Sequence, residues 1–171
     1  MEELNLKGKI IGLDTMVFIY HFEENRVYSP LTFSIFESLE KGNFNGITST
    51  LTLLEILVKP KKENNLLLTE RYKLLFETFP NLQVKTLNEN IADIASSLRA
   101  NYNINTPDAI QVATSLEAKA DIFITNDKTL KKIIEIMLNI FFSLYKPSSP
   151  LKRSHLLSLT FRIMNKLKVV K

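Results

Sequence analysis

"NTPDAIQVATSLEAKADIFITND", residues 105–127, reads as a helix followed by a short buried strand. Pro107 is typical of the first turn of a helix, and the pattern predicts a helix over about 106–119. The apolar run DIFIT, residues 121–125, is typical of a strand that is buried on both faces of a sheet. Acids stand at the boundaries of the two elements, at Asp108, Asp121 and Asp127. Helix capping can explain them, and so can a metal site, provided that further acids come from elsewhere in the chain.

Strands and helices alternate along the rest of the chain. Short apolar or alternating runs predict further strands at 10–13, 46–50 and 82–87. Helical spacing predicts helices over about 29–41, 51–60, 71–79, 88–102 and 106–119, and a last one from about 127. Pro60 is expected to end the second of these helices. Alternation of this kind predicts a mostly parallel sheet that is covered by helices on both sides.

The composition excludes several classes of protein. The 171 residues suffice for one domain with a substantial core, and 45% hydrophobic against 23% charged residues indicates a globular chain. No Cys is present, which excludes disulfides, thiolate catalysis and Cys-based zinc sites and fits a reducing cytoplasm. Glu2 and Glu3 stand where a signal peptide would carry basic residues. We therefore expect a cytoplasmic protein.

The most apolar segment is IIEIMLNIFFSLY at 133–145. It spans 13 residues and contains Glu135, whereas a helix that crosses a bilayer needs about 20 apolar residues. The segment therefore predicts a buried or interfacial helix and no membrane span.

Charge is distributed unevenly between the two ends of the chain. Residues 1–145 hold 15 Lys and Arg against 18 Asp and Glu, a net charge of −3. Residues 146–171 hold seven Lys and Arg and no acid, so the net charge of +4 comes from a basic C-terminal tail. The tail begins with the breaker cluster KPSSP. Its sequence is compatible with a flexible extension, with an arm that attracts RNA, or with a helix docked on the sheet or on a partner.

Two of the predicted strands end in the same way. IIGL runs into Asp14, and DIFIT runs into Asn126 and Asp127. In open α/β sheets, ligands bind beyond the carboxyl ends of the strands, so these acids face each other if the strands are neighbours. Asp108 and Glu55 lie on helices that can reach the same edge. Crowded carboxylates repel unless a cation binds them, and oxygen ligands suit Mg²⁺ or Mn²⁺.

Each acid also has an alternative interpretation when it is taken alone. Asp14 can accept backbone hydrogen bonds at a strand end, and Glu55 can be a solvated helix residue. Asp108 follows the expected cap Thr106 and suits the helix dipole. Asp127 can cap the helix expected to begin near residue 128.

Three segments considered together, LDTMVFIY, ITSTLTLLEIL and NTPDAIQVATSLEAKADIFITND, resemble the PIN-domain family, especially the VapC-type toxin ribonucleases. The resemblance covers about residues 9–135. The matching acids, in the order and approximate spacing of the family, are Asp14, Glu55, Asp108 and Asp127. Met16 departs from the family, in which Asn or Ser is common two residues after the first Asp. The region after about residue 137 lacks the family's usual short closing strand.

The resemblance implies an α/β/α sandwich of three layers, with a mostly parallel sheet of four to five strands. It implies a PIN-like nuclease domain at 1–146, followed by the basic tail at 147–171. The implied activity is hydrolysis of RNA phosphodiester bonds by an endoribonuclease that depends on Mg²⁺ or Mn²⁺. A cognate antitoxin and a homodimer are the implied protein partners, and we expect Phe141 and Phe142 near the dimer contact.

The resemblance also implies a role for each matching acid. Asp14, Asp108 and Asp127 would hold the metal, and Glu55 would ligate it through water or orient the attacking water. The residues expected to hydrogen-bond these carboxylates are Thr15, Thr125 and Asn126, although Asn126 equally suits a turn.

Two other functions are compatible with parts of the pattern. A phosphatase of the haloacid-dehalogenase type also begins with Asp after a strand, but it needs a second Asp where this chain has Met16. Met16 and the unusual C-terminal region keep open a PIN-like module that binds RNA or a partner protein without catalysis.

Overall fold

A four-stranded parallel sheet forms the centre of the computed structural model, which describes residues 6–127 and 130. Its strands are β1 (Ile10–Leu13), β2 (Asn45–Ser49), β3 (Leu82–Lys85) and β4 (Ile122–Ile124). They lie in the order β3-β2-β1-β4, and every neighbouring pair is parallel. The strand order therefore reverses between β1 and β4, because β2 and β3 follow on one side of β1 and β4 is added on the other.

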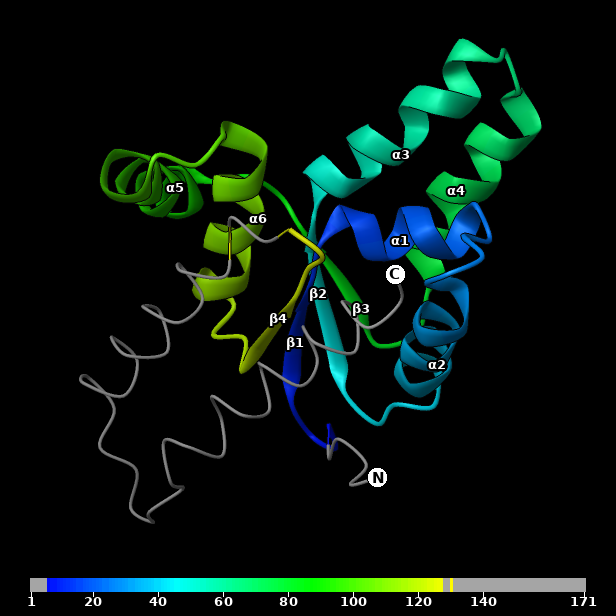
Figure 1. Cartoon of the computed structure of the whole chain (residues 1–171), viewed down its shortest axis with the longest axis horizontal. Coiled ribbons are helices and arrows are strands. Elements are labelled where there is room, and N and C mark those ends of the chain that lie inside the picture. The colour runs from blue at the N-terminus through cyan, green and yellow to red at the C-terminus, as the bar shows by residue number, and fades with distance from the viewer. Residues whose placement is uncertain (1–5, 128–129, 131–171) are drawn as a thin grey trace.

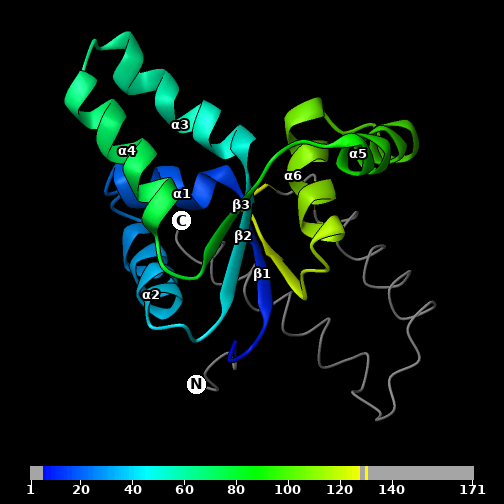
Figure 2. The ribbon, with the colours of Figure 1, turned by 180° about the vertical axis from the view of Figure 1, so that it is seen from behind.

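Six helices connect these strands within the described part of the chain. They are α1 (Thr15–Phe22), α2 (Ser29–Glu40), α3 (Thr50–Lys62), α4 (Leu66–Thr78), α5 (Glu89–Tyr102) and α6 (Thr106–Glu117). Helices α1 to α4 cover one face of the sheet, and α5 and α6 cover the other (Figure 1 and, from behind, Figure 2). The α/β sandwich of three layers is thus confirmed.

Each layer of helices encloses its own hydrophobic core. The core under α1 to α4 includes Leu13, Phe18 and Leu39, and the core under α5 and α6 includes Ile91 and Val112. Strand β4 serves both cores, because Ile122 and Ile124 pack into the first and Phe123 packs into the second. Alternate side chains of a strand point to opposite faces, so a strand in the middle of a three-layer fold is apolar throughout.

Gly12 allows α6 to pack closely against β1. A Cβ atom at this position would overlap the side chain of Ser115 and lie 2.7 Å from Cδ2 of Phe123. We therefore expect Gly12→Ala to lower the free energy of unfolding by about 1–3 kcal/mol, as overpacking of a tight core does. Urea unfolding measures this loss. Ala100→Ser, on the exposed side of α5, is the matched control, and an equal loss in the two variants would contradict the close packing.

Four details of the helices differ from the sequence predictions. Helix α4 begins at Leu66, five residues before the predicted start at 71. Helix α1 was not predicted, because its eight residues have no polar face that marks helical periodicity. Pro60 does not end α3, which continues to Lys62, since a proline near the last turn removes only one helical hydrogen bond. The cap of α6 is Asn105 rather than Thr106, because the Asn105 side chain accepts a hydrogen bond from the backbone N–H of Asp108.

Several other expectations fall outside the described residues. They concern the helix from about 127, a fifth strand, the apolar segment at 133–145 and the basic tail at 147–171. Within residues 6–127 and 130, no helix combines the length and the apolar character that a membrane crossing requires.

Candidate active site

The acids predicted from the sequence belong to elements that meet at one edge of the sheet. Asp14 directly follows β1, and its backbone N–H donates a hydrogen bond of 3.1 Å to the carbonyl oxygen of Ile124 at the end of β4. Asp127 lies three residues beyond Ile124. Because the strand order reverses between β1 and β4, the crevice beyond their carboxyl ends is the expected ligand site of an α/β sheet.

Asp14 is the most deeply buried of these acids, with 8% of its surface exposed. The pKa of the Asp14 carboxyl is raised to about 6, mainly by burial and to a smaller extent by the negative charges of Asp108 and Glu55. Two hydrogen bonds oppose this rise: one from the Thr125 hydroxyl at 2.5 Å and one from the backbone of Thr15. The fold therefore holds a carboxylate in a place that disfavours its ionised form.

Thr125 links the acids of β1 and β4. Its hydroxyl donates to Oδ2 of Asp14 and accepts a hydrogen bond of 3.0 Å from the backbone N–H of Asp127. One small side chain therefore fixes both a carboxylate and the turn that carries the next acid.

Asp108 stands in the first turn of α6. Helix α6 leads into β4 and runs back along the sheet, so its N-terminus lies at the edge where the strands end (Figure 1). The Asn105 amide donates to Oδ2 of Asp108 at 2.7 Å and thereby orients its carboxylate. Partial burial raises the pKa of Asp108, and the charges of Asp127 and Glu55 add to the rise, while the Asn105 hydrogen bond lowers it.

Glu55 comes from α3, which begins directly after β2. The Ser49 side chain caps this helix by accepting a hydrogen bond of 3.1 Å from the backbone N–H of Leu51. Oε2 of Glu55 accepts a short hydrogen bond from the hydroxyl of Thr15, the residue after Asp14. Thr15 directly follows Asp14 in the chain, so its hydrogen bond connects the segment that carries the buried Asp14 to Glu55 on α3.

Asn126 has a different contact from the one expected at a carboxylate. Its amide donates a hydrogen bond of 2.9 Å to the hydroxyl of Tyr20, whose ring stacks on Tyr28 with 4.4 Å between the ring centroids. Asn126 therefore contacts α1, and this contact supports the turn that leads from β4 to Asp127.

All four acids interact electrostatically, but they are not gathered into a chelating group. The pKa of Asp14 responds to the charges of Asp108 and Glu55, and the pKa of Asp108 responds to those of Asp127 and Glu55. Among the described residues, no three His, Cys, Asp or Glu side chains lie close enough to hold an ion. The oxygen-only donor set suits Mg²⁺ or Mn²⁺.

Gln111 is a residue of this region that the sequence analysis did not select. It lies on α6 one turn after Asp108, is 3% exposed, and donates hydrogen bonds to the hydroxyls of Thr15 and Thr52. In the sequence, Gln111 stands out only as a long polar side chain on a helix face that otherwise consists of small or apolar residues such as Ala109.

Other acids of the quoted stretch have structural contacts. Asp121 exchanges two hydrogen bonds of 2.8 Å with the backbone of Ile10, and so joins the start of β4 to the start of β1. Glu117 lies 3.6 Å from the ammonium group of Lys85, and its side chain is only 24% exposed. Both residues therefore have a role in the fold that is independent of the four candidate site acids, which we call the acidic rim: Asp14, Glu55, Asp108 and Asp127.

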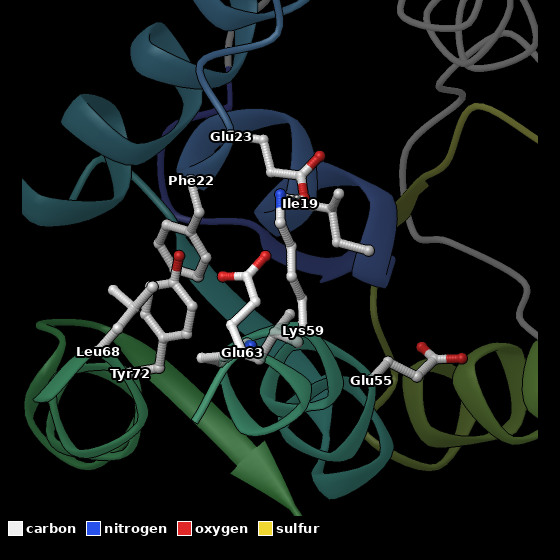
Figure 3. A pocket seen from close by; sticks show the side chains of 10 residues that line it. Ile19, Phe22, Glu23, Glu55, Lys59, Glu63, Leu68 and Tyr72 are labelled. Atoms are coloured by element: carbon white, nitrogen blue, oxygen red, sulfur yellow. Dashed lines mark hydrogen bonds and ion pairs between the residues drawn. The ribbon is translucent and has the colours of Figure 1, made fainter. Parts of the chain in front are cut away.

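A cavity of about 280 Å³ lies beside the acidic rim, between α1 and the pair α3 and α4. Glu23 and Lys59 form an ion pair of 2.8 Å within its lining, where Glu63 and Tyr72 also lie. Glu55 belongs to the lining, but Figure 3 shows its carboxylate pointing away from the other lining residues. The cavity is thus a neighbour of the rim and not its centre.

Comparison with known proteins gives a family and two similar structures. The model of the PIN domain family matches residues 11–136. A chain of a toxin-antitoxin complex from Klebsiella pneumoniae is 21% identical, with a TM-score of 0.56 over 74% of this chain and 92% of that chain. A chain of VapBC2 from Rickettsia felis, bound to a DNA fragment from the promoter, is 18% identical, with a TM-score of 0.57 over 72% and 92%. The curated proteins contain no match. At these identities the two structures show a shared fold.

Proposed function

The chain belongs to the PIN domain family, and from this premise we propose that it is a metal-dependent endoribonuclease and the toxin of a toxin-antitoxin pair. The observation that carries the proposal is the buried carboxylate of Asp14, placed at the switch point of the sheet with Asp108 and Glu55 close enough to raise its pKa. A fold that keeps acids together at such a cost in the absence of a cation is suited to binding one.

The four acids have separate roles in this proposal. Asp14, Asp108 and Asp127 hold Mg²⁺ or Mn²⁺, and Glu55 ligates through water or orients the water that attacks the phosphate. The metal, when bound, lowers the pKa of that water and stabilises the charge that develops on the phosphate. Thr125 keeps Asp14 and the turn to Asp127 in place, and Thr15 keeps Glu55 in place.

The proposed partners are an RNA substrate, a cognate antitoxin and a second copy of the chain, all in the cytoplasm. The two similar structures are a toxin-antitoxin complex and a VapBC2 complex, which supports the antitoxin. We expect light scattering at tens of micromolar to give the mass of a homodimer. The mass of a single chain would contradict this expectation.

The experiment that tests the activity is cleavage of mixed single-stranded RNA by the purified full-length chain. Cleavage with Mn²⁺ and loss of cleavage with a chelator are the expected results. The alternative is a PIN-like module that binds RNA or a partner protein without catalysis, and Met16, which stands where Asn or Ser is common in the family, favours it. Binding of RNA without cleavage at saturating Mn²⁺ would support that alternative and overturn the nuclease.

A further inference from the structure

We infer that Gln111 is a positioning residue, whose side-chain amide orients the Thr15 hydroxyl so that its proton points to Glu55 at the acidic rim. The inference rests on the proposed function, because that function gives Glu55 its role. The inference concerns a buried layer behind the acidic rim, which consists of the Gln111 amide and the hydroxyls of Thr15, Thr48 and Thr52.

The layer joins four elements of the fold through short contacts. Nε2 of Gln111, on α6, lies 2.8 Å from the hydroxyl oxygen of Thr15 on α1 and 2.6 Å from that of Thr52 on α3. The hydroxyl of Thr52 lies 2.8 Å from that of Thr48 at the end of β2. Thr48 in turn donates a hydrogen bond of 2.9 Å to the carbonyl oxygen of Leu13, the residue before Asp14. All four side chains of the layer are buried.

The number of available protons fixes the direction of every hydrogen bond in this layer. Thr48 gives its only proton to Leu13, and Thr15 gives its only proton to Glu55. Thr52 then donates to Thr48 at 2.8 Å rather than to Thr15 at 3.1 Å. The hydroxyls of Thr15 and Thr52 must therefore each accept a hydrogen bond, and the two protons of the Gln111 amide supply both.

The opposite orientation of the amide cannot satisfy the same contacts. If the Gln111 oxygen took the place of its nitrogen, the layer would contain three hydroxyl protons for five close contacts. Thr15 would then have to share its proton between Gln111 and Glu55, and Glu55 would lose a donor for part of the time. The orientation that presents two N–H groups thus directs the Thr15 proton to the rim.

This orientation of the Gln111 amide leaves one of its buried atoms without a hydrogen-bond partner among the described residues. Oε1 of Gln111 is buried and has no hydrogen-bond partner within the described residues. A buried acceptor without a partner destabilises a protein, so an apolar side chain of equal length would suit the packing at least as well. We therefore attribute the glutamine at position 111 to its two N–H donors. One of them binds the Thr15 hydroxyl, which in turn donates to Glu55.

Gln111→Met is the variant that separates positioning from packing. It preserves the length of the side chain and removes both the two donors and the unpaired acceptor, so we expect an unchanged or higher Tm. We expect the affinity for Mn²⁺, measured by calorimetry, and the rate of Mn²⁺-dependent RNA cleavage to fall about tenfold or more. Thr114→Val is the matched control, since Thr114 is a buried residue of the same helix whose hydroxyl donates to the backbone of Ile110.

Substitutions of Thr15 test the same path from its other end. Thr15→Val removes the hydroxyl and should lower Mn²⁺ affinity as Gln111→Met does, while Thr15→Ser restores the hydroxyl and should restore the affinity. In NMR spectra of the parent, both side-chain amide protons of Gln111 should exchange slowly with water, and Thr15→Val should release one of them. This pair of variants gives the answer if Gln111→Met fails to fold.

The outcomes distinguish the inference from the proposed function. Parent-like Mn²⁺ affinity and cleavage in Gln111→Met, or a Thr15→Ser variant as weak as Thr15→Val, would overturn the inference and leave the nuclease intact. A parent chain that binds Mn²⁺ but cleaves no RNA would overturn the nuclease, while the affinities of the variants still establish the positioning role. A parent chain that binds no Mn²⁺ would overturn both.

Discussion

Replacing Asp14 with alanine is expected to reduce Mn²⁺-dependent RNA cleavage at least about a hundredfold, because a catalytic metal contributes several kcal/mol to stabilising the transition state. Asp14 is the acid on which the other contacts converge, since the Thr125 hydroxyl donates to it and the charges of Asp108 and Glu55 act on it. Its loss removes one proposed metal ligand and leaves the Thr125 hydroxyl without its acceptor. Initial rates on a single-stranded RNA at saturating Mn²⁺ measure the effect.

Two further variants make this result specific to the acidic rim. Asp108→Ala should show a loss of the same order, because Asp108 is also a proposed metal ligand. Asp93→Ala, on the exposed side of α5, should cleave like the parent. Near-full activity of Asp14→Ala at saturating Mn²⁺ would show that the metal site lies elsewhere.

The architecture was predictable because it depends on patterns that are local in the sequence. The strands β1 and β4 are short apolar runs bounded by polar residues, and the helices between β3 and β4 show helical spacing. The order of the strands, in contrast, was not predictable from local patterns. Strand β4 lies beside β1 through pairs such as Gly12 and Phe123, which are more than a hundred positions apart in the sequence.

The candidate site was predictable only in part. The four acids were selected by their places at strand ends and helix starts and by the family resemblance, which are properties of the sequence. Gln111 and Thr52 could not be selected in this way, because their role exists only where α1, α3 and α6 come together. The contact of Asn126 with Tyr20 likewise depends on the fold, since 106 positions separate the two residues. Hydrogen-bond partners that are distant in the sequence leave no periodic signal in it.

Asp14→Asn is expected to stabilise the metal-free protein at pH 7 by up to about 3 kcal/mol. The pKa of the Asp14 carboxyl is about 6 in the folded chain, against a usual value of 3.8, and one pKa unit corresponds to about 1.4 kcal/mol. A raised pKa means that the folded state binds the proton more tightly than the unfolded state does. Burial is the main cause, so asparagine, which is neutral and of similar size, removes the penalty.

The same pKa shift sets the dependence on pH. Below about pH 4 the carboxyl is protonated in both states, so the parent and Asp14→Asn should unfold at similar urea concentrations. Between about pH 4 and pH 6 the unfolded parent has released this proton while the folded parent still holds it, so the parent loses stability relative to the variant, and the difference should approach its full value near pH 7. Urea unfolding at pH 4, 5, 6 and 7 in the presence of a chelator measures this difference. Asp93→Asn, on the exposed side of α5, is the matched control.

Added Mn²⁺ should reverse the order of stability at pH 7. Binding to the folded state stabilises the parent by about 4.1 kcal/mol when the free metal is at a thousand times its Kd, which exceeds the penalty of about 3 kcal/mol, whereas Asp14→Asn lacks a proposed ligand and should gain little. The charge that destabilises the metal-free fold is, in this account, the charge that binds the cation. If Mn²⁺ stabilises the parent and Asp14→Asn equally, the Asp14 charge destabilises the metal-free fold but takes no part in metal binding.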